Sequence, residues 1–185
     1  RIRLGTLVSP VTFRYPAAVA KAVATIDQIS GGRVELGLGA GWNEPEHRQH
    51  GFPFPELRDR MTMLEEQVEI VHRLWTEDDV TFEGQHYQCS GITIEPKPKA
   101  RPRPPVWIAN NAVGSRTLIE RTHQRAVDHA DGWETSLFAV DDLRWRLADL
   151  RDRYQNRTGD DVGGHREAHD QSVPAGSGFH SRERR

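Results

Sequence analysis

Apolar and polar positions follow two periods along the chain, and they predict alternating strands and helices. A period of two, or a short apolar run, predicts strands at residues 2–8, 34–38 and 106–109, and a fourth, short strand that opens with residues 130–133. Spacings of three and four predict helices at residues 17–29, 56–75, 115–130 and 141–154. Two shorter patterns, 80–82 and 86–89, predict a hairpin. This order favours an α/β fold with a parallel sheet covered by helices, either an open sheet or a (β/α)8 barrel.

Residues at the helix ends and on the helix faces extend this picture. Pro16 can serve as the first residue of the first helix, and Gly31 and Gly32 end that helix by adopting the left-handed conformation. The buried face of this helix is expected to hold Val19, Val23, Ile26 and Ile29. Asp141 is expected to cap the last helix, whose buried side would hold Leu143, Leu147, Leu150 and Tyr154.

The two ends of the chain read differently from its middle. Arg1 is not an initiator Met, and the residues after it already have a strand pattern, so we expect the chain to begin upstream. Residues 158–185 mix glycine, histidine and charged residues without any apolar period, which predicts a disordered segment. The folded domain is therefore expected to span residues 1–157.

The composition excludes several classes of partner. The chain has 185 residues, 36% of them apolar, and a formal net charge of −2, which gives no electrostatic reason to bind nucleic acid or an anionic membrane. Cys89 is the single cysteine, so an intrachain disulfide is ruled out. The sequence shows neither a signal peptide nor a run of the ~20 apolar residues that span a bilayer. These features predict a soluble, cytoplasmic protein.

Candidate ligand sites lie at the strand ends, because parallel α/β folds bind ligands there. Four ends are polar or glycine-rich, at residues 6–10, 37–44, 109–116 and 133–135. Gly37, Gly39 and Gly41 only weakly resemble a dinucleotide fingerprint, because the third glycine comes one residue early and Pro45 follows. The alternatives are close strand packing near a barrel axis, or room for a flat ring against the strand end, and the second is the better interpretation of the sequence.

The third strand end is the stronger candidate for binding a phosphate. Asn110, Asn111 and Gly114 lead directly into a helix at Ser115, where free backbone N–H groups and the positive end of the helix dipole attract an anion. Arg116 would add positive charge. The alternative is an ordinary helix cap by Ser115.

The remaining histidines and tryptophans give weaker signals. His47 and His50 lie near Glu44 and Glu46, but a solvated loop is the better interpretation than a metal site. His123 and His129 are assigned to the polar side of their helix, so the sequence predicts no metal centre. Trp42 and Trp133 stand near strand ends with polar neighbours, and both are expected to line a pocket.

Several segments together resemble the luciferase-like monooxygenase superfamily, especially its branch that depends on deazaflavin (coenzyme F-420). The segments are LGTLVSPVTFRYPAAVAKAVATIDQISGGRVELGLGAGWNEPEHRQHGFPFPELRDRM, then LW at 74–75, FEGQHYQ, PKP at 96–98, PPVWIA and ADGW at 130–133. The resemblance implies a (β/α)8 TIM barrel of which this chain supplies about strands three to six, with an inserted hairpin. It also implies a cis peptide bond at Leu7–Val8 that supports the cofactor ring.

The resemblance further implies a set of cofactor-binding residues. Ring contacts would come from Thr6, Leu7 and Val8, with Ala40, Gly41 and Asn43 bordering the ring or its polyol chain. Phosphate contacts would come from Asn110, Asn111, Ala112, Gly114 and Ser115. The implied cofactor is coenzyme F-420, with FMN as the alternative. The catalytic residues stay unknown, because those of the sugar-phosphate dehydrogenase subgroup belong to a strand that this sequence lacks.

Two hypotheses about function follow from these features. The first is a flavin- or deazaflavin-dependent oxidoreductase that transfers a hydride to or from a small organic substrate, or oxygenates it. Trp42 stands where sugar-phosphate dehydrogenases of this branch have a carboxylate, which argues against glucose-6-phosphate as the substrate. The second is a truncated, non-catalytic barrel remnant. The expected partner is a small molecule, with neither nucleic acid nor membrane, and a homodimer is compatible with the resemblance.

Overall fold

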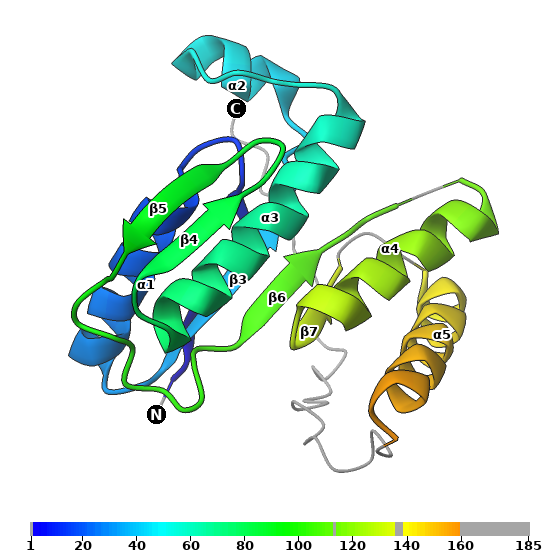
Figure 1. Cartoon of the computed structure of the whole chain (residues 1–185). Helices are drawn as coiled ribbons and strands as arrows, with labels where there is room; N and C mark the ends of the chain where they lie inside the picture. The colour runs from blue at the N-terminus through cyan, green and yellow to red at the C-terminus, as the bar shows by residue number, and fades with distance from the viewer. Residues whose placement is uncertain (1, 113, 136–138, 160–185) are drawn as a thin grey trace, which may run out of the picture.

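One parallel sheet organises the chain. The computed structural model describes residues 2–112, 114–135 and 139–159. Its five strands are β1 (Leu4–Gly5), β2 (Ser9–Pro10), β3 (Val34–Gly39), β6 (Val106–Ala109) and β7 (Gly132–Glu134). β1 and β2 both pair with β3, β3 pairs with β6, and β6 pairs with β7, always in parallel (Figure 1). The expected parallel α/β order is confirmed.

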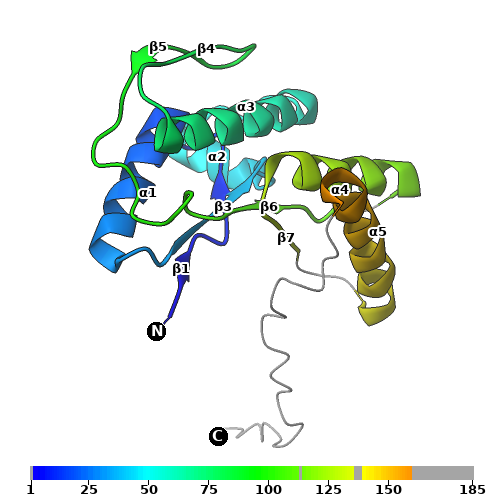
Figure 2. The ribbon, with the colours of Figure 1, turned by 60° about the horizontal axis from the view of Figure 1, so that its bottom comes forward.

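Helices cover one face of this sheet. Figure 2 shows α1 (Pro16–Ser30), α3 (Leu57–Thr76) and α4 (Arg116–His129) on the same side, with α5 (Val140–Thr158) beside α4. The hairpin of β4 (Val80–Glu83) and β5 (Gln88–Ile92) lies beyond α3. The core forms between the sheet and the helices. Its fully buried members include Leu36, Leu38, Leu64, Val68, Val71, Leu74 and Ile108.

Helix α1 begins and ends as the sequence predicts. Pro16 is its first residue, and Gly31 follows it in the left-handed conformation with φ 75°. Its buried face differs, however, because Ile26 and Ile29 are exposed while Asp27 is fully buried. The apolar positions of α1 form a stripe that is wider than the surface buried by the sheet and α3.

The last helix differs from its predicted form in two ways. α5 starts at Val140 after Ala139, so Asp141 lies in its first turn rather than at the cap, and the helix continues to Thr158. Its buried residue is Arg146, held by Asp142, whereas Leu147 is more than half exposed. The predicted disordered segment 158–185 therefore starts too early, because Thr158 belongs to α5, and its residues 160–185 lie outside the described residues.

A short helix, α2 (Glu44–His50), was not predicted. The Asn43 side chain accepts a hydrogen bond from the Glu46 N–H, and Gly51 ends the helix at φ 72°. His47 lies on this helix and is only 1% exposed, so its assignment to a solvated loop is wrong. Its ring nitrogens contact the Thr12 hydroxyl at 2.6 Å and the Asn43 carbonyl at 2.7 Å. These bonds explain how a histidine is accommodated in the interior.

None of the helices in the described ranges combines the length and apolar content that a membrane crossing requires.

The hairpin is anchored to α3 by one carboxylate. Glu66 accepts hydrogen bonds from the backbone N–H groups of Gln85, His86 and Tyr87 at 2.7–3.0 Å. A side chain on Gly84 would lie 2.5 Å from the same carboxylate, so a larger residue in this turn would have to displace Glu66. The hairpin therefore has a fixed attachment point.

His72 on α3 predicts that the stability of the fold decreases in acid. Burial, together with the positive charge of Arg103, lowers the pKa of His72 from 6.5 to about 4, and its Nε2 is buried without a partner among the described residues. The unfolded chain takes up this proton more readily, so the stability is complete above pH 6.5 and is lost as the pH falls towards 4. At 1.36 kcal/mol per pKa unit the loss is about 3 kcal/mol.

Urea unfolding at pH 7.5 and pH 4.5, followed by circular dichroism, measures this loss. His72→Gln should lose less stability between the two pH values than the wild type, and His50→Gln, at an exposed position, is the control. Equal losses in the wild type and His72→Gln would show that His72 does not carry the effect.

Candidate functional site

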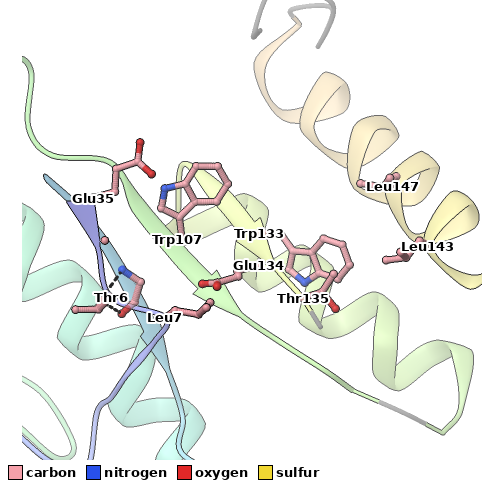
Figure 3. A pocket seen from close by; sticks show the side chains of 11 residues that line it. Thr6, Leu7, Glu35, Trp107, Trp133, Glu134, Thr135, Leu143 and Leu147 are labelled. Atoms are coloured by element: carbon pink, nitrogen blue, oxygen red, sulfur yellow. Dashed lines mark hydrogen bonds between the residues drawn. The ribbon is translucent and has the colours of Figure 1, made fainter. Parts of the chain in front are cut away.

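A cavity of about 570 Å³ lies on the sheet face opposite α1, α3 and α4 (Figure 3). Side chains alternate between the two faces of a strand, so Glu35 and Gly37 point away from the core residues Leu36 and Leu38. The lining comes from β1 and the turn after it, from β3, β6, β7 and α5: Gly5, Thr6, Leu7, Glu35, Gly37, Trp107, Trp133, Glu134, Thr135, Leu143 and Leu147.

The turn at Thr6–Val8 forms one wall of the cavity. The strand predicted over 2–8 is interrupted here, and the Leu7–Val8 peptide bond is cis, as the family resemblance implied. The Thr6 hydroxyl donates to the Gly37 carbonyl at 2.8 Å and accepts from the Gly37 N–H at 3.0 Å. In the turn between β1 and β2, the Thr6 side chain therefore replaces the missing backbone pairing with β3. The turn leaves Leu7 88% exposed at the cavity.

Gly37 and Gly39 make room for that turn. A Cβ on Gly37 would lie 2.1 Å from the Thr6 carbonyl oxygen and 2.8 Å from Val8 Cγ1. A Cβ on Gly39 would lie 2.9 Å from Val8 Cγ2. Val8 therefore packs on these glycines. The glycine pattern serves close strand packing, which was one of the alternatives left open by the sequence.

The loop after β6 is fixed by its own hydrogen bonds. The Asn110 side chain accepts from the Ala112 N–H at 2.7 Å, and Asn111 accepts from the Thr135 hydroxyl at 3.0 Å. Ser115 caps α4 by accepting from the Leu118 N–H, which is the capping role considered from the sequence. Space around Gly114 is open, with φ 120°. The loop thus presents the amino-terminal end of α4 beside the end of β7.

The segment after β3 lies apart from the cavity lining. Gly41 adopts φ 84°, and a Cβ there would lie 3.4 Å from both Thr12 Oγ1 and His47 Nε2. Asn43 is engaged in starting α2. Trp42 is 86% exposed and does not line the cavity, so that expectation is wrong for Trp42, whereas it is confirmed for Trp133.

A buried histidine supports Trp133 from the helix side. His123 is 1% exposed, with Nδ1 2.7 Å from Asp149 and its ring 5.4 Å from Trp133. Its assignment to the polar side of the helix is therefore wrong. Burial lowers the pKa of His123 against the opposing effect of Asp149. In the described part of the chain, no three His, Cys, Asp or Glu side chains gather in a way that would hold a metal ion.

The structure brings together only part of the predicted site. Thr6 and Leu7 line the cavity, Val8 packs behind them, and the Asn110–Ser115 end lies next to β7 through the bond from the Asn110 N–H to the Glu134 carbonyl. Glu35 and Trp107 belonged to none of the strand ends that the sequence marked as candidate sites, and Glu134 belonged to the end at 133–135 without a role of its own. The alternation within β3, β6 and β7 was the available signal, because it places these three side chains away from the core.

The fold and the cavity define a class of protein: a parallel βα sheet with a cavity on the side that would face the interior of a barrel. Within that class the chain belongs to the luciferase-like monooxygenase family, whose sequence profile matches residues 1–183.

Individual relatives include both deazaflavin and flavin enzymes. The chain is 45% identical over 112 residues to an F420-dependent glucose-6-phosphate dehydrogenase of Intrasporangium calvum, covering 59% of this chain and 33% of that protein. It is 32% identical over 133 residues to the FMNH(2)-dependent dimethylsulfone monooxygenase of Pseudomonas putida, covering 72% of this chain and 37% of that protein. The chain therefore spans about a third of these relatives.

A solved structure supports the fold. An F420-dependent secondary alcohol dehydrogenase in complex with an F420-acetone adduct matches with a TM-score of 0.71 and 24% identity, over 87% of this chain and 46% of that one. The architecture is thus that of a partial barrel, as the sequence predicts.

Proposed function

We propose that this chain forms the cofactor-facing part of an oxidoreductase that uses coenzyme F-420, with FMN as the alternative. It would transfer a hydride to or from a small organic substrate, or oxygenate it. The observation that carries the proposal is the Thr6–Val8 turn, which exposes Leu7 beside a cavity of about 570 Å³. When bound, the cofactor supplies the redox chemistry, while the protein positions its ring and excludes water.

The cavity lining and the amino-terminal end of α4 fit such a cofactor, whereas residues 40–43 lie apart from the lining. The proposed ring contacts are Thr6, Leu7 and Val8, with Ala40, Gly41 and Asn43 near the ring or polyol chain. The proposed phosphate contacts are Asn110, Asn111, Ala112, Gly114 and Ser115. The flat indoles of Trp107 and Trp133 line the cavity, and the amino-terminal end of α4 supplies positive partial charge. A cytoplasmic location, a small-molecule substrate and a homodimer belong to the same proposal.

The relatives favour F-420 over FMN. The identity to the F420-dependent relative is 45%, against 32% for the FMNH(2)-dependent one. The wild-type chain should therefore bind F-420 saturably and FMN at least about tenfold more weakly, which is about 1.4 kcal/mol. Titration with each cofactor, followed by fluorescence, measures both affinities. If neither cofactor binds, the non-catalytic remnant becomes the better description of the chain.

A pair of glycine variants locates the phosphate end. Gly114→Glu would place a negative charge at the amino-terminal end of α4 and should weaken F-420 binding at least about tenfold. Gly114→Gln is the matched control, because it imposes the same backbone strain at φ 120° without the negative charge. Equal affinity in the two variants would argue against the assignment of the phosphate site.

A further inference from the structure

Two carboxylates line the cavity, and their surroundings differ. Glu35 forms an ion pair with Arg3. For the carboxylate of Glu134, the described residues provide neither an ion pair nor a hydrogen bond, although its backbone carbonyl accepts from the Asn110 N–H. A carboxylate without a protein partner at a cavity wall is available to a ligand.

Glu134 and Glu35 lie at opposite ends of the strands, and the position of Glu134 is the one expected for a catalytic residue. Strand pairing places Glu134 opposite Ala109, at the carboxyl ends of the strands, whereas Glu35 pairs with Gly5 at the other end of the site. Active sites of βα barrels lie at the carboxyl ends. Figure 3 shows the Glu134 carboxylate directed towards Leu7, in the turn proposed to contact the cofactor ring.

Gly37 leaves the space that this carboxylate occupies. Oε2 of Glu134 lies 3.3 Å from the point where a Cβ on Gly37 would stand. The neighbouring side chains of the lining are mainly apolar, namely Leu7, Trp107, Trp133, Leu143 and Leu147. Burial raises the pKa of Glu134 above its ordinary 4.5. A higher pKa makes the carboxylate a better proton acceptor.

The two hydroxyls of the lining are already engaged, and the indole N–H groups of Trp107 and Trp133, which are buried without a partner among the described residues, can only donate. The Thr6 hydroxyl is bonded to Gly37, and the Thr135 hydroxyl donates to Asn111. Glu35 is the other titratable group of the lining, and Arg3 compensates its charge. β6 and α5 contribute only Trp107, Leu143 and Leu147. Glu134 therefore stands out as the group that can exchange a proton with a ligand.

We infer that Glu134 is a catalytic residue, the base that takes the hydroxyl proton of an alcohol substrate during hydride transfer. In this step the O–H bond breaks and its proton moves to the Glu134 carboxylate. The C–H bond breaks at the same carbon, and its hydrogen leaves with both electrons to the oxidised deazaflavin. A carbonyl group forms, so the alcohol loses two electrons and two hydrogens in total. The inference rests on the proposed function.

Three variants and two measurements test this role. The first measurement is carbon-13 NMR of the cofactor-free chain with labelled glutamate carboxyls. One resonance should titrate above 4.5, be absent from Glu134→Gln and remain in Glu35→Gln. The second is a single-turnover reduction of bound F-420 by propan-2-ol, used as a simple secondary alcohol. Glu134→Gln should slow it about 100-fold or more, with F-420 affinity within about threefold of wild type. Glu69→Gln, a control variant at an exposed position of α3 outside the cavity lining, should stay close to the wild-type rate.

The outcomes separate the two proposals. A wild-type chain that binds neither F-420 nor FMN overturns the proposed function and, with it, the assignment of Glu134. A chain that binds FMN alone overturns the assignment of Glu134, because the proposed hydride acceptor is a deazaflavin. Saturable binding with no reduction by the alcohol, or with equal rates in wild type and Glu134→Gln, overturns the Glu134 assignment alone. A Glu134 resonance that titrates at or below 4.5 also contradicts it.

Discussion

Gly37→Ala is expected to destabilise the chain by on the order of 3 kcal/mol and to abolish cofactor binding. The new Cβ would stand 2.1 Å from the Thr6 carbonyl oxygen and 2.8 Å from Val8 Cγ1. The first of these atoms belongs to the backbone, so rotation of a side chain cannot relieve the contact. The turn would have to move away from β3, which would also break both hydrogen bonds between the Thr6 hydroxyl and Gly37.

Gly5→Ala is the matched control on the neighbouring strand. A Cβ on Gly5 would meet its nearest atom, the Glu35 carbonyl oxygen, at 3.4 Å, which is an ordinary contact. Urea unfolding and F-420 titration of both variants measure stability and binding separately. If Gly37→Ala is as stable as Gly5→Ala and binds F-420 equally well, the turn does not depend on this glycine.

The order of strands and helices could be predicted from the sequence because each element has its own period and end signals. The break in the first strand could not be predicted, because it depends on Thr6 meeting Gly37 of a different strand. Helix α2 was missed although Asn43 and Gly51 mark its ends, since seven residues are too few to establish an apolar period.

The wrong burial predictions concern polar residues with distant partners. His47 is buried because Thr12, 35 positions earlier, provides a hydroxyl at 2.6 Å. His123 is buried beside Asp149, 26 positions later. A sequence pattern shows that these residues are polar, but it does not show that the fold places a hydrogen-bond partner beside them in the interior. Ile26 and Ile29 show the reverse case, apolar residues left uncovered.

Part of the cavity lining could be predicted from the sequence. The rule that ligands bind at strand ends identifies Thr6 and Leu7, and both line the cavity. The rule does not reveal which of the side chains that line the cavity have partners within the protein. That Glu35 has Arg3 as its partner while Glu134 lacks one among the described residues becomes visible only in three dimensions.

Asp27→Ala is expected to cost on the order of 4 kcal/mol, a large share of the stability of a domain of this size. Asp27 is fully buried in α1. Its carboxylate accepts from the Val34 N–H at 3.3 Å and from the N–H groups of Lys99 and Ala100 at 2.7 and 2.8 Å. One side chain thus joins α1, the start of β3 and the proline-rich connection to β6. Alanine would leave these backbone donors without their acceptor.

Asp27→Asn provides an intermediate test, because it keeps one oxygen acceptor but turns an NH2 group towards backbone donors. Its loss of stability should lie between that of wild type and Asp27→Ala. Asp141→Ala removes an exposed carboxylate that pairs with Arg144 at the surface, and it should change the stability by less than about 1 kcal/mol. Urea unfolding followed by circular dichroism ranks the three variants. If Asp27→Ala proves as stable as Asp141→Ala, the three-way connection does not hold the fold together, and the sheet must be supported by its apolar core alone.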